Sequence, residues 1–169
     1  MELSGKEWGK KLTIRLVWKT VPRFLIMFLG EFHHTLDDKG RLSVPSGYRV
    51  ALSKGAVVTR GLDRTLFLYP KEQWRSLAGK IAALPFSQAD TRAFARLMLA
   101  GAIEVKLDKS GRIVIPEYLR IYANLSKKVV ISGLYDRLEI WNEVSWNDYV
   151  KKAEKNSNDI AERLGPLGL

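Results

Sequence analysis

Two segments of the sequence repeat one short pattern of charged residues. "LDDKGRLSVP" occupies residues 36–45 and "LDKSGRIVIP" occupies residues 107–116, so every shared position recurs after 71 residues. The charged and turn-forming positions that the two copies share are Asp37, Gly40 and Arg41, and Asp108, Gly111 and Arg112. An aspartate that starts a turn accepts backbone N–H groups, and a glycine allows a positive φ within it. The pattern therefore predicts a tight turn that presents an arginine at the start of a strand.

The chemistry that such a turn can perform is recognition of an anion. A lysine accompanies each arginine, Lys39 in the first copy and Lys109 in the second. A guanidinium forks onto a phosphate or onto the edge of a guanine, so these residues suit nucleic acid. The alternative is that each Asp–Arg pair is an internal salt bridge that fixes the turn. Both roles are compatible if the aspartate orients the arginine.

Other basic residues could add contacts to a polyanion. They are Arg49, Arg60, Arg64, Arg120, Lys127, Lys128 and Arg137. Most surface charges only solvate a face, so we expect a minority of these residues to touch a partner. The formal net charge of +10 over 169 residues favours nucleic acid or anionic lipid as that partner.

Enzymatic chemistry finds little support in the sequence. The only histidines are adjacent: His33 and His34. In a strand their side chains would point to opposite faces and could not share a metal. Aspartates could suggest a metal-dependent nuclease, but Asp38 and Asp63 are replaced by Lys109 and Tyr135 in the second copy. No Walker loop, GxGxxG or GxSxG motif occurs. We therefore expect no catalytic residues, no metal, no cofactor and no small-molecule substrate.

The absence of cysteine excludes disulfides and cysteine-based zinc sites, and it suits a reducing cytosol. No apolar run approaches the roughly 20 residues that span a bilayer. Basic residues before "FLIMFLG" superficially resemble a signal peptide, but the apolar stretch is short and lacks a small-residue cleavage site. We expect no membrane partner, and we interpret residues 1–26 as an N-terminal extension, with Met27 as the usual start.

The repeat continues beyond the two turns and defines the domain organisation. Arg49 pairs with Arg120 at an offset of 71 residues, one residue is then inserted, and Trp74 pairs with Trp146. Two long copies indicate a duplicated small unit rather than a solenoid. Such a unit is close to the lower size limit for independent stability, so it needs its twin. The expected segments are an extension (1–26), unit one (31–73), connecting helices (74–101), unit two (102–145) and C-terminal helices (146–169).

Each unit is predicted to contain short strands followed by a helix. The strands are expected at 31–36, 56–60 and 65–69 in the first unit and at 102–107, 128–132 and 137–141 in the second, each with an additional strand after the arginine that proline terminates. Apolar residues at helical spacing predict a helix from Trp74 and another from Trp146, the latter capped by Ser145 with Asp148. Ser87 is expected to cap a helix at 88–99, and residues 157–164 resemble a short terminal helix. The fold class is α+β in one pseudo-symmetric body.

Four segments resemble the MraZ family of bacterial transcriptional regulators. They are "MFLGEFHHTLDDKGRLSVPSGYR", "YPKEQW", "GAIEVKLDKSGRIVIPEYLR" and "IWNEVSW". This family has two tandem SpoVT–AbrB-type units, each with an Asp-x-x-x-Arg motif, and the resemblance extends from Met27 to Leu169. It implies swapped-hairpin β units and a ring-shaped homo-oligomer in the cytoplasm and nucleoid. It also implies binding to short direct repeats in double-stranded DNA, with repression of the protein's own division and cell-wall gene cluster.

By this resemblance the recognition residues are Arg41 and Arg112, with Asp37 and Asp108 as their orienting partners. The alternative function is a ring-forming interaction protein whose basic face binds an acidic protein. The sequence leaves open the operator, the number of subunits and whether a given gene is repressed or activated.

Overall fold

The computed structural model describes residues 27–168, and the expected extension at 1–26 lies outside this part of the chain. The fold is α+β, with two tandem units of antiparallel strands that are each followed by helices, which confirms the predicted class. The first unit contains β1 (Phe28–Thr35), β2 (Arg41–Ser43), η2 (Ser46–Tyr48), α1 (Arg49–Leu52), β3 (Ala56–Arg60) and β4 (Leu66–Pro70). The second contains β5 (Ile103–Val105), β6 (Arg112–Val114), α4 (Glu117–Tyr122), β7 (Lys128–Tyr135) and β8 (Leu138–Asn142).

The two units exchange their first strands. β1 of the first unit pairs with β7 of the second, and β5 of the second pairs with β3 of the first. The hairpins β3–β4 and β7–β8 join through β4 and β8, which gives a six-stranded sheet in the order β1-β7-β8-β4-β3-β5. β2 and β6 form a separate two-stranded sheet. Neither unit can complete its sheet alone, so the duplication serves the fold.

Strand lengths follow from these partners. β7 runs to Tyr135 and provides pairing for Phe28, Leu29 and Gly30, so β1 begins three residues before the predicted strand at 31–36. β5 has only three residues, since the chain turns toward the Asp108 motif directly after it. A single main core lies between the sheet, the β2–β6 pair and the short helices α1 and α4. Leu42, Ile113, Leu66 and Leu138 are all fully buried within it.

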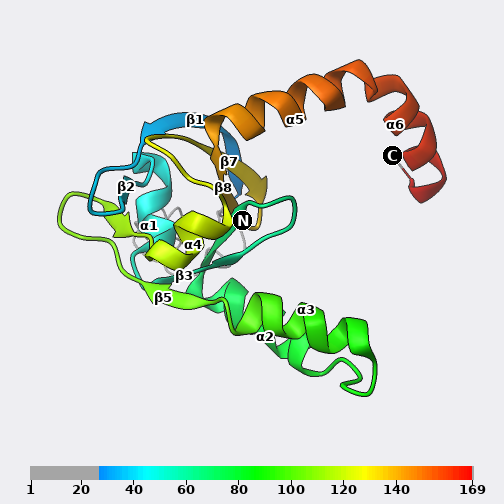
Figure 1. The fold of residues 1–169 in the computed structure, drawn as a ribbon, viewed down its shortest axis with the longest axis horizontal. Helices are drawn as coiled ribbons and strands as arrows, with labels where there is room; N and C mark the ends of the chain where they lie inside the picture. Colours follow the sequence, from blue (N-terminus) through cyan, green and yellow to red (C-terminus); the bar gives the residue numbers. More distant parts are fainter. Residues whose placement is uncertain (1–26, 169) are drawn as a thin grey trace, which may run out of the picture.

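Two helical arms extend from this body in different directions (Figure 1). One arm is the hairpin of α2 (Lys71–Ala82) and α3 (Ala89–Leu99), which buries Ile81 and Met98 against Phe67 and Tyr69. The other is α5 (Glu143–Lys155), followed by α6 (Ser157–Leu164) and η3 (Gly165–Leu167). Neither α5 nor α6 contains a buried residue.

The predicted helix caps were wrong. α5 begins at Glu143 and its cap is Asn142, whose side-chain oxygen accepts the N–H groups of Val144 and Ser145 at 2.9 and 3.3 Å. β8 runs directly into the helix, so its last residue caps it, and Ser145 already lies inside. α3 begins at Ala89 after Gln88, so Ser87 is not its cap. Among the described residues no helix is long and apolar enough to cross a membrane.

Candidate nucleic-acid interface

The first predicted turn is held by its aspartate. One carboxylate oxygen of Asp37 accepts the backbone N–H groups of Lys39 and Arg41 at 3.0 and 2.9 Å. The other accepts the Nε–H of Arg41 at 2.6 Å. Gly40 has a φ of +73°, in the left-handed region that favours glycine. The aspartate therefore closes the turn and aims the guanidinium, so the two sequence interpretations describe one arrangement.

The second turn repeats this geometry. Asp108 accepts the backbone N–H groups of Ser110 and Arg112 at 2.8 and 2.9 Å. The Nε and a terminal nitrogen of Arg112 each lie 2.8 Å from the other carboxylate oxygen. Gly111 has a φ of +75°. The turns differ at their exposed tips, because Asp38 and Lys39 of the first correspond to Lys109 and Ser110 of the second.

Both aspartates are held in the ionised form. The backbone N–H of Arg41, followed by its guanidinium, lowers the pKa of Asp37 below the usual value of an aspartate. The equivalent groups of Arg112 lower the pKa of Asp108. Each carboxylate thus keeps its charge at neutral pH and remains a partner for its arginine, while the remaining guanidinium nitrogens face outward.

The structure brings the two turns together through the β2–β6 pair, which we call the ribbon (Figure 1). Arg41 lies opposite Val114, Leu42 opposite Ile113, and Ser43 opposite Arg112. Leu42 and Ile113 are fully buried and form the inner face. Since side chains alternate along a strand, the outer face carries the other four residues, with Arg41 and Arg112 on a diagonal. Two motifs that are 71 residues apart in sequence therefore form one surface.

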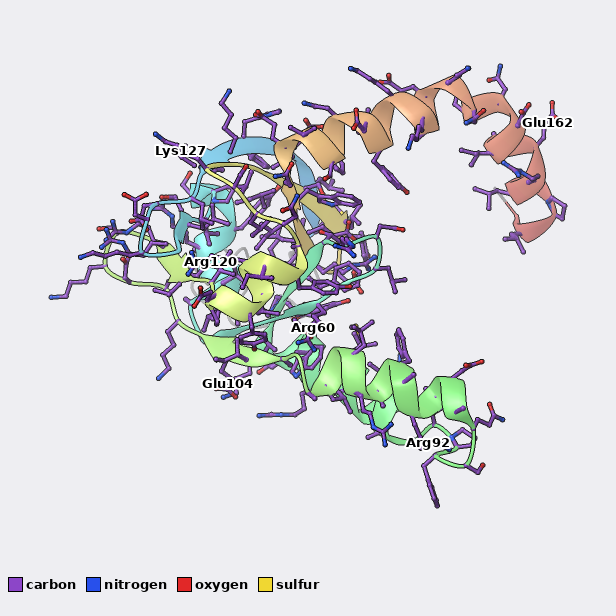
Figure 2. The ribbon with its side chains drawn as sticks, in the orientation of Figure 1. Arg60, Arg92, Glu104, Arg120, Lys127 and Glu162 are labelled. Atoms are coloured by element: carbon purple, nitrogen blue, oxygen red, sulfur yellow. The ribbon has the colours of Figure 1, made fainter. Side chains whose placement is uncertain are left out.

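Two further arginines reach across the ribbon. Arg49, which begins α1, donates from Nε to the carbonyl of Val44 at 2.9 Å and lies against Gly111 of the other unit. Arg120 of α4 lies against Gly40 in the same way. The sequence identified both only as general basic residues, although their pairing in the repeat was the signal that gave them equivalent positions. Figure 2 labels Arg120 on the side of α4 that faces the turns.

The remaining basic candidates lie elsewhere. The guanidinium of Arg60 stacks over the rings of Tyr118 and Tyr122, and Figure 2 shows it on the far side of α4 from the turns. Arg137 stacks over Phe67 and is paired with Asp136 and Glu139. Arg64 occupies the β3–β4 turn with a φ of +56°. Lys127 and Lys128 are exposed at the start of β7.

The histidines take separate roles. Exposed His33 contacts Glu143 through Nδ1 at 3.1 Å and Glu31 through Nε2 at 3.0 Å, and these carboxylates, Glu143 foremost, raise its pKa. Half-buried His34 has a lowered pKa, chiefly because of burial and then because of Arg49. In the described part of the chain no three His, Cys, Asp or Glu side chains gather as metal ligands would.

Comparisons with known proteins place nearly all of the described chain in one context. A family model described as "MraZ protein, putative antitoxin-like" matches twice, at residues 27–97 and 98–165. The protein named Transcriptional regulator MraZ from Pediococcus pentosaceus is 48% identical over 143 residues, which cover 85% of this chain and all of that relative. The protein of the same name from Desulfitobacterium hafniense gives the same identity and coverage. The one from Natranaerobius thermophilus is 49% identical over 138 residues, 82% of this chain and 96% of the relative.

Proposed function

The chain belongs to the MraZ family, and from this membership we propose that it is a transcriptional regulator that binds double-stranded DNA through the ribbon. The observation that carries the proposal is the pairing of β2 with β6, which joins both Asp–Arg turns on one outer face. The relatives are named as regulators and not as enzymes, in agreement with the sequence prediction that the chain is not an enzyme.

The dimensions of the ribbon suit duplex DNA. The major groove of B-form DNA admits a two-stranded β-ribbon, and arginine bidentate to guanine is the commonest specific contact there. Arg41 and Arg112 are each held by a carboxylate on one side of the guanidinium. A side chain that is already oriented loses less conformational freedom on binding, so the aspartates make these arginines better readers.

The turn tips suit the phosphate backbone. Lys39 and Lys109 are exposed at the ends of the ribbon, where flexible ammonium groups would meet phosphates beside the groove. Arg49 and Arg120 add positive charge beside both turns while they hold the turn backbone. We assign base contacts to the two motif arginines and phosphate contacts to the lysines.

The resemblance to the family extends the proposal to a biological setting. The regulator would occupy short direct repeats upstream of its own division and cell-wall gene cluster and repress that cluster. It would act as a ring-shaped homo-oligomer in the cytoplasm, associated with the nucleoid. Exposed apolar side chains on both arms, among them Phe86 and Val144, support further association of subunits.

A footprint on the DNA upstream of the protein's own gene tests this proposal. We expect protection of repeated short segments by the full chain, and a steep decrease of affinity with salt because phosphate contacts release counterions. Arg96 on α3 is exposed and distant from the ribbon, so Arg96→Ala is the matched control for loss of one positive charge. Uniform protection without preferred segments would contradict sequence-specific regulation. Absence of DNA binding would favour the ring-forming protein with an acidic partner.

A further inference from the structure

The ribbon has a local two-fold symmetry in its backbone and in its arginines. The strands are antiparallel and cross at Leu42 and Ile113, so rotation about that point exchanges Arg41 with Arg112. The same rotation exchanges Ser43 with Val114. A ribbon with identical residues at all exchanged positions would present the same surface in either direction along the DNA. Any difference between exchanged residues therefore gives the ribbon a direction.

The outer face breaks this symmetry at its centre. Ser43 lies opposite Arg112 and Val114 lies opposite Arg41, so each arginine has a different cross-strand neighbour. Val114 is 54% exposed, which is high for a strand valine beside charged residues. Ser43 is partly exposed, and within residues 27–168 its hydroxyl has no hydrogen-bond partner. One exchanged position thus offers methyl groups, and the other offers a free donor and acceptor.

The turn tips break the symmetry in the same sense. Asp38 and Lys109 occupy equivalent positions next to the orienting aspartates, and both are exposed. A carboxylate repels the phosphate backbone, whereas an ammonium attracts it. The end of the ribbon that carries Lys109 therefore grips the backbone more strongly than the end that carries Asp38. Charge at the ends and side-chain chemistry at the centre both distinguish the two directions.

We propose that Ser43 and Val114 are specificity-determining residues that make the ribbon a directional reader of a non-palindromic DNA segment. Valine methyl groups favour the C5-methyl of thymine, while a serine hydroxyl hydrogen-bonds to several base edges. Arg41 and Arg112 supply equivalent contacts on either side, and the two central residues select different bases. This inference rests on the proposed function, because it requires that the outer face of the ribbon enters the groove.

Reciprocal substitutions test the proposal with little risk to the fold. Ser43→Val makes the centre of the ribbon symmetrical, and valine suits a strand. The exchange variant, which combines Ser43→Val with Val114→Ser, keeps the composition and charge of the wild type and reverses the centre. Thermal melting of each full-length variant identifies any that is unfolded. If Ser43→Val is unfolded, Val114→Ser alone provides the symmetrical ribbon.

The measurement is selection from a pool of DNA duplexes with a random central segment, followed by sequencing. The wild type should enrich a non-palindromic motif, Ser43→Val a motif whose central positions become symmetrical, and the exchange variant a motif with those positions interchanged. Each changed base should alter affinity by roughly fivefold or more when retested alone. If all proteins enrich the same motif, Ser43 and Val114 are not readers, although the proposed function stands. If the wild type enriches no motif, the proposed function itself is wrong, and this inference fails with it.

Discussion

Arg120 of the second unit lies directly against Gly40 of the first. A Cβ atom at Gly40 would stand 3.0 Å from Nε of Arg120 and 2.8 Å from the carbonyl oxygen of Ile115. Arg49 of the first unit lies against Gly111 of the second in the same manner. Each turn is therefore shaped by its own unit and covered by the other. Recognition and folding share these residues, so a substitution here must be judged by both measurements.

We predict that Gly40→Ala destabilises the fold. The positive φ of Gly40 costs an L-residue about 1–2 kcal/mol. The overlap with the Ile115 carbonyl adds to this cost, because backbone cannot move aside as a flexible side chain can. Unfolding in urea should show a decreased free energy of unfolding, together with weaker DNA binding as the arginine loses its orientation.

Gly79→Ala is the control for this substitution. Gly79 lies within α2, and a Cβ there would meet nothing within 4 Å. Alanine favours the helix over glycine by up to about 1 kcal/mol, so this variant should be as stable as the wild type or more stable. Equal stability of Gly40→Ala and wild type would contradict the tight packing of the first turn.

The pH dependence of His33 provides a second prediction. Glu143 and Glu31 raise its pKa, so the folded protein binds the proton more tightly than the unfolded chain. Its contribution to stability is therefore complete below about pH 6.5, the value of an unperturbed histidine, and is lost as the pH rises through the higher folded value. NMR titration should give a pKa above 6.5, and Glu143→Gln should lower it. A pKa that Glu143→Gln leaves unchanged would contradict the contact that links β1 to α5.

The sequence predicted the turns well because their chemistry is local. The aspartate, the glycine and the arginine lie within five consecutive residues, and each acts on its neighbours. The strands after these turns and both hairpins also followed from local patterns. The partner of each strand did not, because pairing of β1 with β7 joins residues about a hundred positions apart. The exchange of strands entered only through the family resemblance.

The same distinction explains what the sequence analysis missed at the candidate site. Arg49 and Arg120 cover the glycine of the opposite unit, and no local pattern could reveal this contact. Asn142 caps α5 because β8 ends there, a boundary that apolar spacing placed three residues too late. The domain boundaries, the extension at 1–26 and the DNA-contacting roles of the motif residues stay predictions.

We predict an oligomer larger than a dimer. The described arms leave large apolar side chains exposed, including Phe86 at 82% and Leu167 at 78%. A protein that reads repeated DNA segments also gains affinity when several modules bind together. Light scattering of the full chain at micromolar concentration should give a mass above that of two subunits. A monomer that still binds its DNA with full affinity would contradict this prediction.

The last prediction separates recognition from folding at the two motif arginines. Arg41→Ala and Arg112→Ala should leave the thermal transition within a few degrees, because exposed ion pairs contribute little to stability. Each should nevertheless weaken specific DNA binding by roughly 1–3 kcal/mol for every bidentate hydrogen-bonded pair with a base that it removes, and the effect should multiply in an oligomer because every subunit carries the change. If the arginines contact only phosphates, affinity should instead fall equally on all sequences, with a shallower salt dependence. Arg96→Ala, which removes an equal charge far from the ribbon, should retain sequence preference. Binding of both variants to the operator like the wild type, or outright unfolding, would assign the turns a structural role and direct the search to Arg49 and Arg120.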